Sequence, residues 1–212
     1  RDRPPESTAT SSRGQRPMAS PPDSDAALIA RAVVADDRHA FAELVRRHQS
    51  VVRACLRRLT AGRHELADDL AQETFVLAWR HLASYRQEAK FSTWLYRIAT
   101  NCWLADARKR KEELLGDAAD DLAEASGTAF AVDAAAPDHA RGATMKLDLE
   151  RALATLSEGE RAAIVQCYYN DLSHEEAAFV LGMPVGTVKT HVLRGKQKLK
   201  AALAAWAPGE ES

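Results

Sequence analysis

The sequence predicts an all-α protein made of two small helical domains, and three observations predict this class. Apolar residues recur at steps of three and four through residues 25–111, which is the spacing of amphipathic helices. Two S-x-x-E capping boxes, at Ser157 and Ser173, mark helix starts in the C-terminal third. Between these parts lies an acidic, Ala- and Asp-rich stretch that is typical of a flexible linker. A chain of 212 residues is long enough for two such domains.

Composition divides the chain into five segments. The two predicted domains span residues 25–111 and 147–206, and the acidic linker at 112–146 joins them. Residues 1–24 are rich in Pro, Ser and Thr, so we expect a disordered arm there. Residues 207–212 form a short tail.

The net charge of −1 hides a strongly uneven distribution. Residues 25–111 carry 16 basic and 10 acidic side chains, whereas residues 112–147 carry 2 basic and 8 acidic ones. A near-neutral total therefore does not argue against nucleic-acid binding, because one segment is clearly basic.

The first domain is expected to contain four helices. A short helix around Leu28 to Val34 precedes a long amphipathic one that ends near Gly62. The third runs from about His64 to Ala83. For the fourth we expect Ser92 to be the N-cap, with Phe91 and Tyr96 forming a hydrophobic staple.

One face of the predicted third helix is acidic and polar. It carries Asp69, Gln72 and Glu73, with the apolar Val76 beside them. For an arbitrary helix the plain interpretation is a solvated surface.

The fourth helix and the loop before it combine aromatic rings with cations. Five of the thirteen Phe, Trp and Tyr residues fall within nineteen positions: Tyr85, Phe91, Trp94, Tyr96 and Trp103. Single-stranded DNA binding needs this mixture, since bases stack on rings while cations neutralise phosphates. Trp94, Arg97 and Asn101 share a helix face, and a run of four cations, residues 108–111, closes the helix.

The second domain predicts a helix-turn-helix. Ala178, Gly182 and Val188 occupy the positions that require a small residue, a turn glycine and a β-branched residue. The second helix, from about Pro184 to Ala205, has an inward stripe of Val188, Val192, Gly195 and Leu199. Its outward side carries Lys189, Thr190, Leu193, Arg194 and Lys198, which suits a DNA major groove.

Catalytic and membrane functions find little support. His174-Glu175 begins like a zinc-binding H-E-x-x-H motif, but Ala178 replaces the second histidine, and phosphate-binding and serine-nucleophile motifs are missing. We therefore expect no enzyme activity, no catalytic residue, no metal and no cofactor.

The longest uncharged stretch has twelve residues, which is too short to cross a membrane. The three cysteines are scattered and do not predict disulfides. For these reasons we expect a cytoplasmic protein.

Three motifs resemble bacterial RNA polymerase sigma factors of the extracytoplasmic-function (ECF) group. Residues 69–75 with Ala78-Trp79 resemble region 2.2, residues 91–101 resemble regions 2.3 and 2.4, and residues 186–191 resemble the recognition helix of region 4.2. The resemblance covers about residues 25–111 and 146–205, in the family's order.

The resemblance implies a role for each surface. Asp69, Gln72, Glu73 and Val76 would dock on the β′ coiled coil of core RNA polymerase. The minus-10 promoter element would be opened and held by Tyr85, Lys90, Phe91, Trp94, Arg97, Asn101, Arg108, Lys109 and Arg110. The minus-35 element would be contacted by Thr187, Lys189, Thr190, Leu193, Arg194 and Lys198. Further implied partners are the polymerase β flap and an anti-sigma factor, and the free chain is expected to be a monomer.

Three positions depart from the family pattern. Trp103 replaces a small residue, His191 stands where arginine is common, and Gly195 lies within a helix at a cost of about 1 kcal/mol relative to alanine.

The acidic linker suggests a further hypothesis. Its negative charge would mimic nucleic acid and bind either the polymerase or the basic domain of the same chain. The alternative function is a stand-alone helix-turn-helix regulator, which would need neither the Asp69 face nor the aromatic and basic helix.

Overall fold

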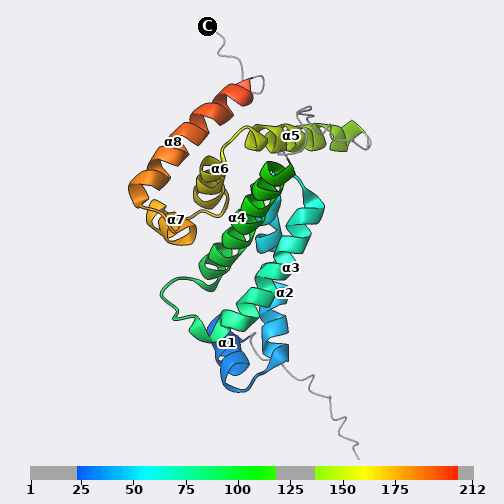
Figure 1. Ribbon diagram of the computed structural model, residues 1–212. Coiled ribbons are helices and arrows are strands. Elements are labelled where there is room, and N and C mark those ends of the chain that lie inside the picture. Colours follow the sequence, from blue (N-terminus) through cyan, green and yellow to red (C-terminus); the bar gives the residue numbers. More distant parts are fainter. Residues whose placement is uncertain (1–22, 118–136, 205–212) are drawn as a thin grey trace, which may run out of the picture.

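The computed structural model describes residues 23–117 and 137–204, and all regular structure in these ranges is helical. The elements in order are α1 (Asp25–Val34), α2 (Arg38–Leu59), α3 (His64–His81), η1 (Leu82–Ser84), α4 (Phe91–Asp117), α5 (Pro137–Ala154), α6 (Glu158–Ile164), η2 (Val165–Tyr169), α7 (His174–Leu181) and α8 (Val185–Ala202). We call residues 23–117 the N-terminal unit and residues 137–204 the C-terminal unit. Helices α6 and α7 of the second unit lie between α4 and α8 (Figure 1). The predicted all-α class is confirmed.

The N-terminal unit is a bundle in which α1 to α4 share one core. Each of the first two helices has a side-chain cap: Ser24 Oγ accepts from the Ala27 amide at 3.3 Å, and Asp37 accepts from the His39 and Ala40 amides. The core is lined by large side chains of α2 and α4 that exclude water almost completely: Leu44, Leu56, Leu59, Leu95 and Trp103. The ring of Trp103, which departs from the family pattern, therefore fills the core.

The start of α4 differs from the prediction. The helix begins at Phe91, and the Trp94 amide donates to the Lys90 carbonyl at 3.1 Å, so Ser92 lies in the first turn and is not the N-cap. The Phe91 ring is buried and stacks on Trp94. Burial of this ring sets the helix start, since apolar burial is worth more than one capping hydrogen bond.

Helices extend into the predicted linker from both sides. α4 continues to Asp117, supported by ion pairs one turn apart, Arg110–Asp106 at 2.8 Å and Lys109–Glu113 at 3.8 Å. α5 begins at Pro137, a residue that the first turn of a helix accepts. The rest of the linker, most of the arm and the tail lie outside the described residues, so the domain boundaries stay predictions.

The C-terminal unit contains both predicted capping boxes. Ser157 and Glu160 bond reciprocally at the start of α6, and Ser173 and Glu176 do so at the start of α7. Gly182 ends α7 in the left-handed region, at φ 63°, as a helix-turn-helix turn requires. Val188 and Val192 are buried against the preceding helices, which confirms the predicted inward stripe.

Gly195 allows α8 to approach α6 closely. A Cβ at this position would lie 2.7 Å from Ile164 Cγ1, closer than real contacts permit. The helix-propensity cost noted from the sequence is therefore offset by close packing between the two helices.

We expect Gly195→Ala to destabilise the protein by about 1–3 kcal/mol, although alanine is the better helix former, because the methyl group overpacks the α6–α8 contact. Urea unfolding followed by circular dichroism measures the change. Gly186→Ala is the matched control, since no atom lies within 4 Å of the position that its methyl group would take, and it should be neutral or stabilising. Equal effects of the two substitutions would contradict this account of the packing.

Candidate nucleic-acid interface

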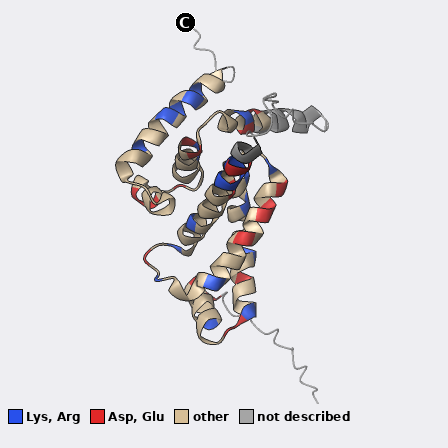
Figure 2. Ribbon diagram, in the orientation of Figure 1, with Lys and Arg blue, Asp and Glu red and all other residues tan. Residues whose placement is uncertain are grey.

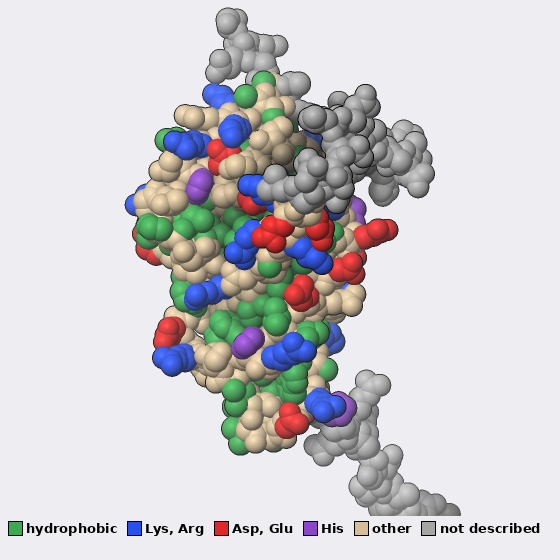
Figure 3. All heavy atoms as spheres, in the orientation of Figure 1, with side chains coloured by type: hydrophobic (Ala, Val, Ile, Leu, Met, Phe, Trp, Pro, Cys, Tyr) green, Lys and Arg blue, Asp and Glu red, His purple; other side chains and the backbone are tan. Residues whose placement is uncertain are grey.

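The outer face of α3 presents the predicted polar stripe to solvent. Asp69, Gln72 and Glu73 are exposed, and the Val76 side chain is 50% exposed. The opposite face, which includes Leu70 and other apolar residues, is buried. Spacings of three and four place the four exposed residues on one side of the helix. Acidic residues recur along α3 (Figure 2), and acidic side chains gather on the same side of the space-filling view (Figure 3).

None of the three polar residues in this stripe forms a hydrogen bond or ion pair with another residue in the described parts of the chain. Their carboxylates and amide are therefore free to accept or donate hydrogen bonds to a second molecule. An exposed valine within a polar rim is the composition that protein interfaces use.

The loop between η1 and α4 is held by a cluster of aromatic rings. Tyr85, Phe91 and Trp94 pack against one another with ring centroids 5.3–5.5 Å apart. The Tyr85 hydroxyl donates to the Ala89 carbonyl at 2.7 Å and closes the loop on itself. Burial raises the pKa of the Tyr85 phenol, so this hydroxyl stays protonated as a donor at neutral pH. The loop is thus a preformed platform.

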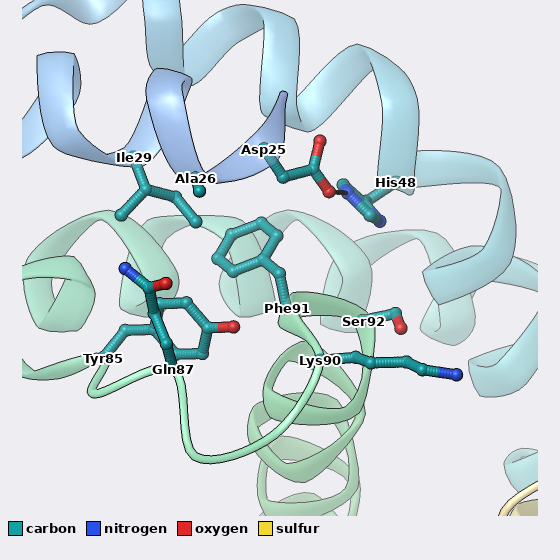
Figure 4. Close-up of a pocket in the computed structure, with 9 residues that line it drawn as sticks. All are labelled: Asp25, Ala26, Ile29, His48, Tyr85, Gln87, Lys90, Phe91 and Ser92. Atoms are coloured by element: carbon teal, nitrogen blue, oxygen red, sulfur yellow. Dashed lines mark hydrogen bonds and ion pairs between the residues drawn. The ribbon is translucent and has the colours of Figure 1, made fainter. Parts of the chain in front are cut away.

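A cavity of about 320 Å³ opens beside this cluster (Figure 4). The Phe91 ring faces into it, and Tyr85 and Gln87 form the side toward the loop. On the opposite side Asp25 and His48 point at each other, with Asp25 Oδ2 2.7 Å from His48 Nε2. Aromatic walls beside hydrogen-bonding groups suit a planar, polar ring such as a nucleobase.

Asp25 and His48 were missed by the sequence reasoning. They come from α1 and α2, and 23 positions separate them. No local pattern marks such a pair, because only the packing of α1 across α2 brings the two side chains together.

The outward face of α4 carries the predicted cations and asparagine. Arg97, Asn101, Arg108 and Lys109 are exposed, and Trp94 is half-buried. Arg110 is engaged by Asp106 of the same helix. Arg97 also faces the C-terminal unit, with its guanidinium carbon 4.6 Å from the centre of the Phe179 ring.

Helix α8 exposes all six of its predicted DNA-contacting residues, although the ammonium of one of them, Lys198, is paired within its own unit. The other five all face solvent: Thr187, Lys189, Thr190, Leu193 and Arg194. Basic residues follow one another along the helix (Figure 2). Leu193, an apolar residue among these polar ones, is 60% exposed.

Lys198, the sixth, points back into its own unit. Its Nζ lies 2.7 Å from Glu160 Oε2, and the Glu160 side chain is only 6% exposed. The Lys198 ammonium, followed by the Ser157 amide, holds the pKa of the Glu160 carboxyl below its usual value. In this arrangement Lys198 stabilises the α6–α8 contact. Sequence periodicity could not show this, because Glu160 lies 38 positions away.

Within residues 23–117 and 137–204, no group of three or more His, Cys, Asp or Glu side chains is placed to hold a metal ion. Among the same residues no helix combines the length and apolar character needed to span a membrane.

Comparisons with known proteins agree with this geometry. Residues 44–113 match the family model for sigma-70 region 2, and residues 146–199 match that for sigma-70 region 4. The ECF RNA polymerase sigma factor SigW of Bacillus subtilis (strain 168) is 34% identical over 178 residues, covering 79% of this chain and 90% of the relative. The ECF RNA polymerase sigma factor SigM of Mycobacterium tuberculosis (strain ATCC 25618 / H37Rv) is 36% identical, covering 85% of each chain.

Two solved structures have similar folds, each with a TM-score of 0.61. One is the sigma factor RpoE in complex with the anti-sigma factor NepR from Bartonella quintana, 26% identical, covering 77% of this chain and 96% of that one. The other is CnrH in complex with the cytosolic domain of CnrY, 27% identical, covering 86% and 99%.

The fold defines an all-helical protein of two units, the second of which contains a helix-turn-helix. The chain belongs to the ECF group of sigma factors, the subunits that direct RNA polymerase to promoters. It binds core RNA polymerase and recognises promoter DNA at transcription initiation, and none of these comparisons favours a stand-alone regulator.

We expect Lys198→Met to lower the free energy of unfolding by about 1 kcal/mol, because it breaks a pair with one nearly buried partner. Lys189→Met, on the exposed face, should have no measurable effect. Urea unfolding of both variants at pH 7 makes the comparison.

The pH dependence provides the second readout. A pKa lowered in the folded state means that the ionised Glu160 stabilises the fold above its unfolded pKa of 4.5, and that this contribution is lost as the pH falls through the folded value. The stability gap between wild type and Glu160→Gln should therefore be constant above about pH 4.5 and begin to narrow as the pH falls below it. A gap that does not narrow with falling pH would contradict the assignment.

Proposed function

We propose that three separate surfaces of this sigma factor carry its three contacts. The exposed face of α3 binds core polymerase, the loop at 85–90 with α4 opens and holds the minus-10 element, and α8 contacts the minus-35 element. The observation that carries the proposal is the presence on one chain of an unengaged acidic stripe, an aromatic and basic helix, and an exposed recognition helix. A simple duplex-binding regulator would need only the last of these.

The α3 stripe is suited to a basic helical partner such as the β′ coiled coil. Asp69 and Glu73 supply charge, Gln72 supplies a donor and an acceptor, and Val76 supplies apolar area at one end of the stripe. Charged groups at such an interface mainly set orientation and association rate, whereas burial of the valine adds affinity. A contact of the C-terminal unit with the β flap belongs to the same proposal by the family resemblance.

The cavity beside Phe91 is the place proposed for a base extruded from the minus-10 element. Unpairing and unstacking one base costs a few kcal/mol. Stacking on Phe91 or Tyr85 and hydrogen bonds to Asp25 or His48 can offset that cost. Lys90, at the cavity rim, and Trp94, Arg97 and Asn101 along α4 would then guide the neighbouring single strand.

The side chains proposed to contact DNA phosphates differ in how firmly an intramolecular partner holds them. Arg108 and Lys109 are exposed at the end of α4 and would neutralise backbone phosphates. Arg110 and Lys198 already have intramolecular partners, Asp106 and Glu160, so each would have to share or leave its carboxylate to reach DNA. On α8, Thr187, Lys189, Thr190, Leu193 and Arg194 are placed to reach the groove.

The remaining properties follow from the family. A non-catalytic role in the cytoplasm is proposed, with a monomeric free chain. An anti-sigma factor is proposed as a regulatory partner. Both similar structures are complexes, one with the anti-sigma factor NepR and the other with the cytosolic domain of CnrY. Transcription in vitro with core polymerase tests the central proposal. The chain should direct initiation at a two-element promoter. Specific duplex binding without polymerase would instead favour a stand-alone helix-turn-helix regulator.

Combined substitution of Asp69, Gln72 and Glu73 by alanine should weaken core binding at least about tenfold, because several complementary contacts are lost together. Fluorescence anisotropy of the labelled chain titrated with core polymerase measures the affinity. Glu112→Ala, an exposed acid on α4, is the control and should bind like wild type. Undiminished affinity of the triple variant would show that another surface docks.

Asn101→Ala and Arg108→Ala should impair promoter use in different ways. Loss of a base-reading group should reduce discrimination between promoter sequences by about 1–3 kcal/mol. Loss of a phosphate contact should weaken all sequences alike and lower the salt-dependence slope by about 1. Holoenzyme binding to matched and mutated promoters at several salt concentrations separates the two, and identical profiles would contradict these assignments.

A further inference from the structure

Helix α8 packs against α6 along a stripe of three residues. His191, Gly195 and Lys198 lie four and three positions apart, which places them on one side of the helix. That side faces α6, because each of the three lies close to an α6 residue. The five side chains placed to reach the minus-35 groove are exposed elsewhere on the same helix. Whatever fixes this stripe therefore also fixes the direction in which those five side chains point.

Two glycines make reciprocal contacts within this stripe. Gly159 of α6 leaves room for the His191 ring, since a Cβ at residue 159 would lie 2.9 Å from both Cε1 and Nε2 of the imidazole. Gly195 of α8 leaves room for Ile164 of α6, as described above. Each helix thus has one glycine that receives a large side chain of the other helix. We call these four residues, Gly159, Ile164, His191 and Gly195, the interlock.

The interlock is held by shape. His191 is only partly exposed, and its Nδ1 is buried without a hydrogen-bond partner among the residues that the structure describes. Gly159 and Gly195 both lie within α-helices, so neither position needs the conformational freedom of glycine. What each glycine supplies is space for the side chain opposite.

An ion pair extends the contact along α8. The same carboxylate oxygen, Glu160 Oε2, accepts from the Ser157 amide at 2.9 Å and from Lys198 Nζ at 2.7 Å. The residue that caps α6 therefore also holds α8. With contacts at residues 191, 195 and 198, α8 is fixed on α6 over about two turns, both in its rotation and in its position along the axis.

Two of the three departures from the family pattern belong to the interlock. His191 replaces a flexible cation by a ring that fits above Gly159, and Gly195 lacks the methyl group that would meet Ile164. Both changes act on the packing of α8 against α6. Neither adds a group that reaches DNA, so they change the placement of the helix rather than its set of contacting side chains.

We infer that the interlock sets the minus-35 preference of this sigma factor by fixing the position of α8 on α6, without touching DNA. Gly159 and His191 are positioning residues in this scheme, because they act through the exposed side chains of α8. Hydrogen bonds to base edges weaken steeply when donor and acceptor are displaced, so a helix shift of about 1 Å changes which base is favoured. The inference rests on the proposed contact of α8 with the minus-35 element.

Gly159→Ala is the central substitution. Alanine suits the backbone of α6, but its methyl group displaces the imidazole, and the displaced ring has to push α8 away or leave the contact. Adding His191→Ala removes the ring, so the double variant has room for the new methyl group and α8 should return toward its original position. Glu158→Ala changes an exposed neighbour in the same turn of α6 and is the matched control.

Transcription by the holoenzyme from a promoter library measures the effect. The library has a randomised minus-35 element and one fixed minus-10 element. Gly159→Ala should reduce the preference for the best wild-type minus-35 sequence over its single-base variants at least about fivefold. The double variant should recover most of this preference, and Glu158→Ala should match wild type. A purely structural role would instead lower transcription from all sequences alike and leave their ranking unchanged.

Urea unfolding of the free chains shows which variants are folded. If Gly159→Ala does not fold, His191→Ala alone takes its place, because it only removes atoms and should also change the ranking of minus-35 sequences. An unchanged ranking in the folded variant overturns the inference. A changed ranking that the double variant does not recover also overturns it, since the fit of ring and glycine would then not be the cause.

Arg194→Ala separates this inference from the proposed function. If it weakens use of the best minus-35 sequence while Gly159→Ala leaves the ranking unchanged, the contact of α8 with the element stands and the interlock is only structural. If neither Arg194→Ala nor Leu193→Ala changes the use of any minus-35 sequence, the proposed contact of α8 fails, and the inference fails with it.

Discussion

Burial of one stripe of α4 is the constraint on which the other features depend. The side chains on one side of this 27-residue helix are buried in the core and fix its rotation about its own axis: Leu95, Ala99, Cys102 and Trp103. In this orientation Arg97 and Asn101 point outward. It also presents Thr100 to the C-terminal unit. The core, the proposed DNA surface and the contact between the units therefore share one helix and would respond together to any rotation of it.

The basic segment and the charge-balanced segment of the sequence lie on different units of the structure. The basic surplus of residues 25–111 lies on the N-terminal unit, which is proposed to bind the minus-10 element, whereas the helix α8 belongs to a segment with balanced charge. A chain arranged in this way gains little from non-specific attraction to DNA.

Local signals predicted the elements well, because each depends on residues within one or two turns. The capping boxes at Ser157 and Ser173, the turn at Gly182 and the exposed stripe around Asp69 all belong to this class. The Ser92 cap was wrong because a distant core outweighed a local hydrogen bond. Gly195, read as a helix defect, is a packing requirement set by Ile164.

The sequence alone determined the helical class, the order of the two units, the family and the faces that solvent can reach, since periodicity, capping and charge are recorded in neighbouring residues. Only the tertiary structure decided which of those exposed-looking groups are already engaged. Lys198 is paired with Glu160, Arg97 lies under Phe179, and Gln166 is buried against Thr100. These pairings join residues 38 to 82 positions apart. No local pattern encodes them, because they arise from the mutual packing of whole helices.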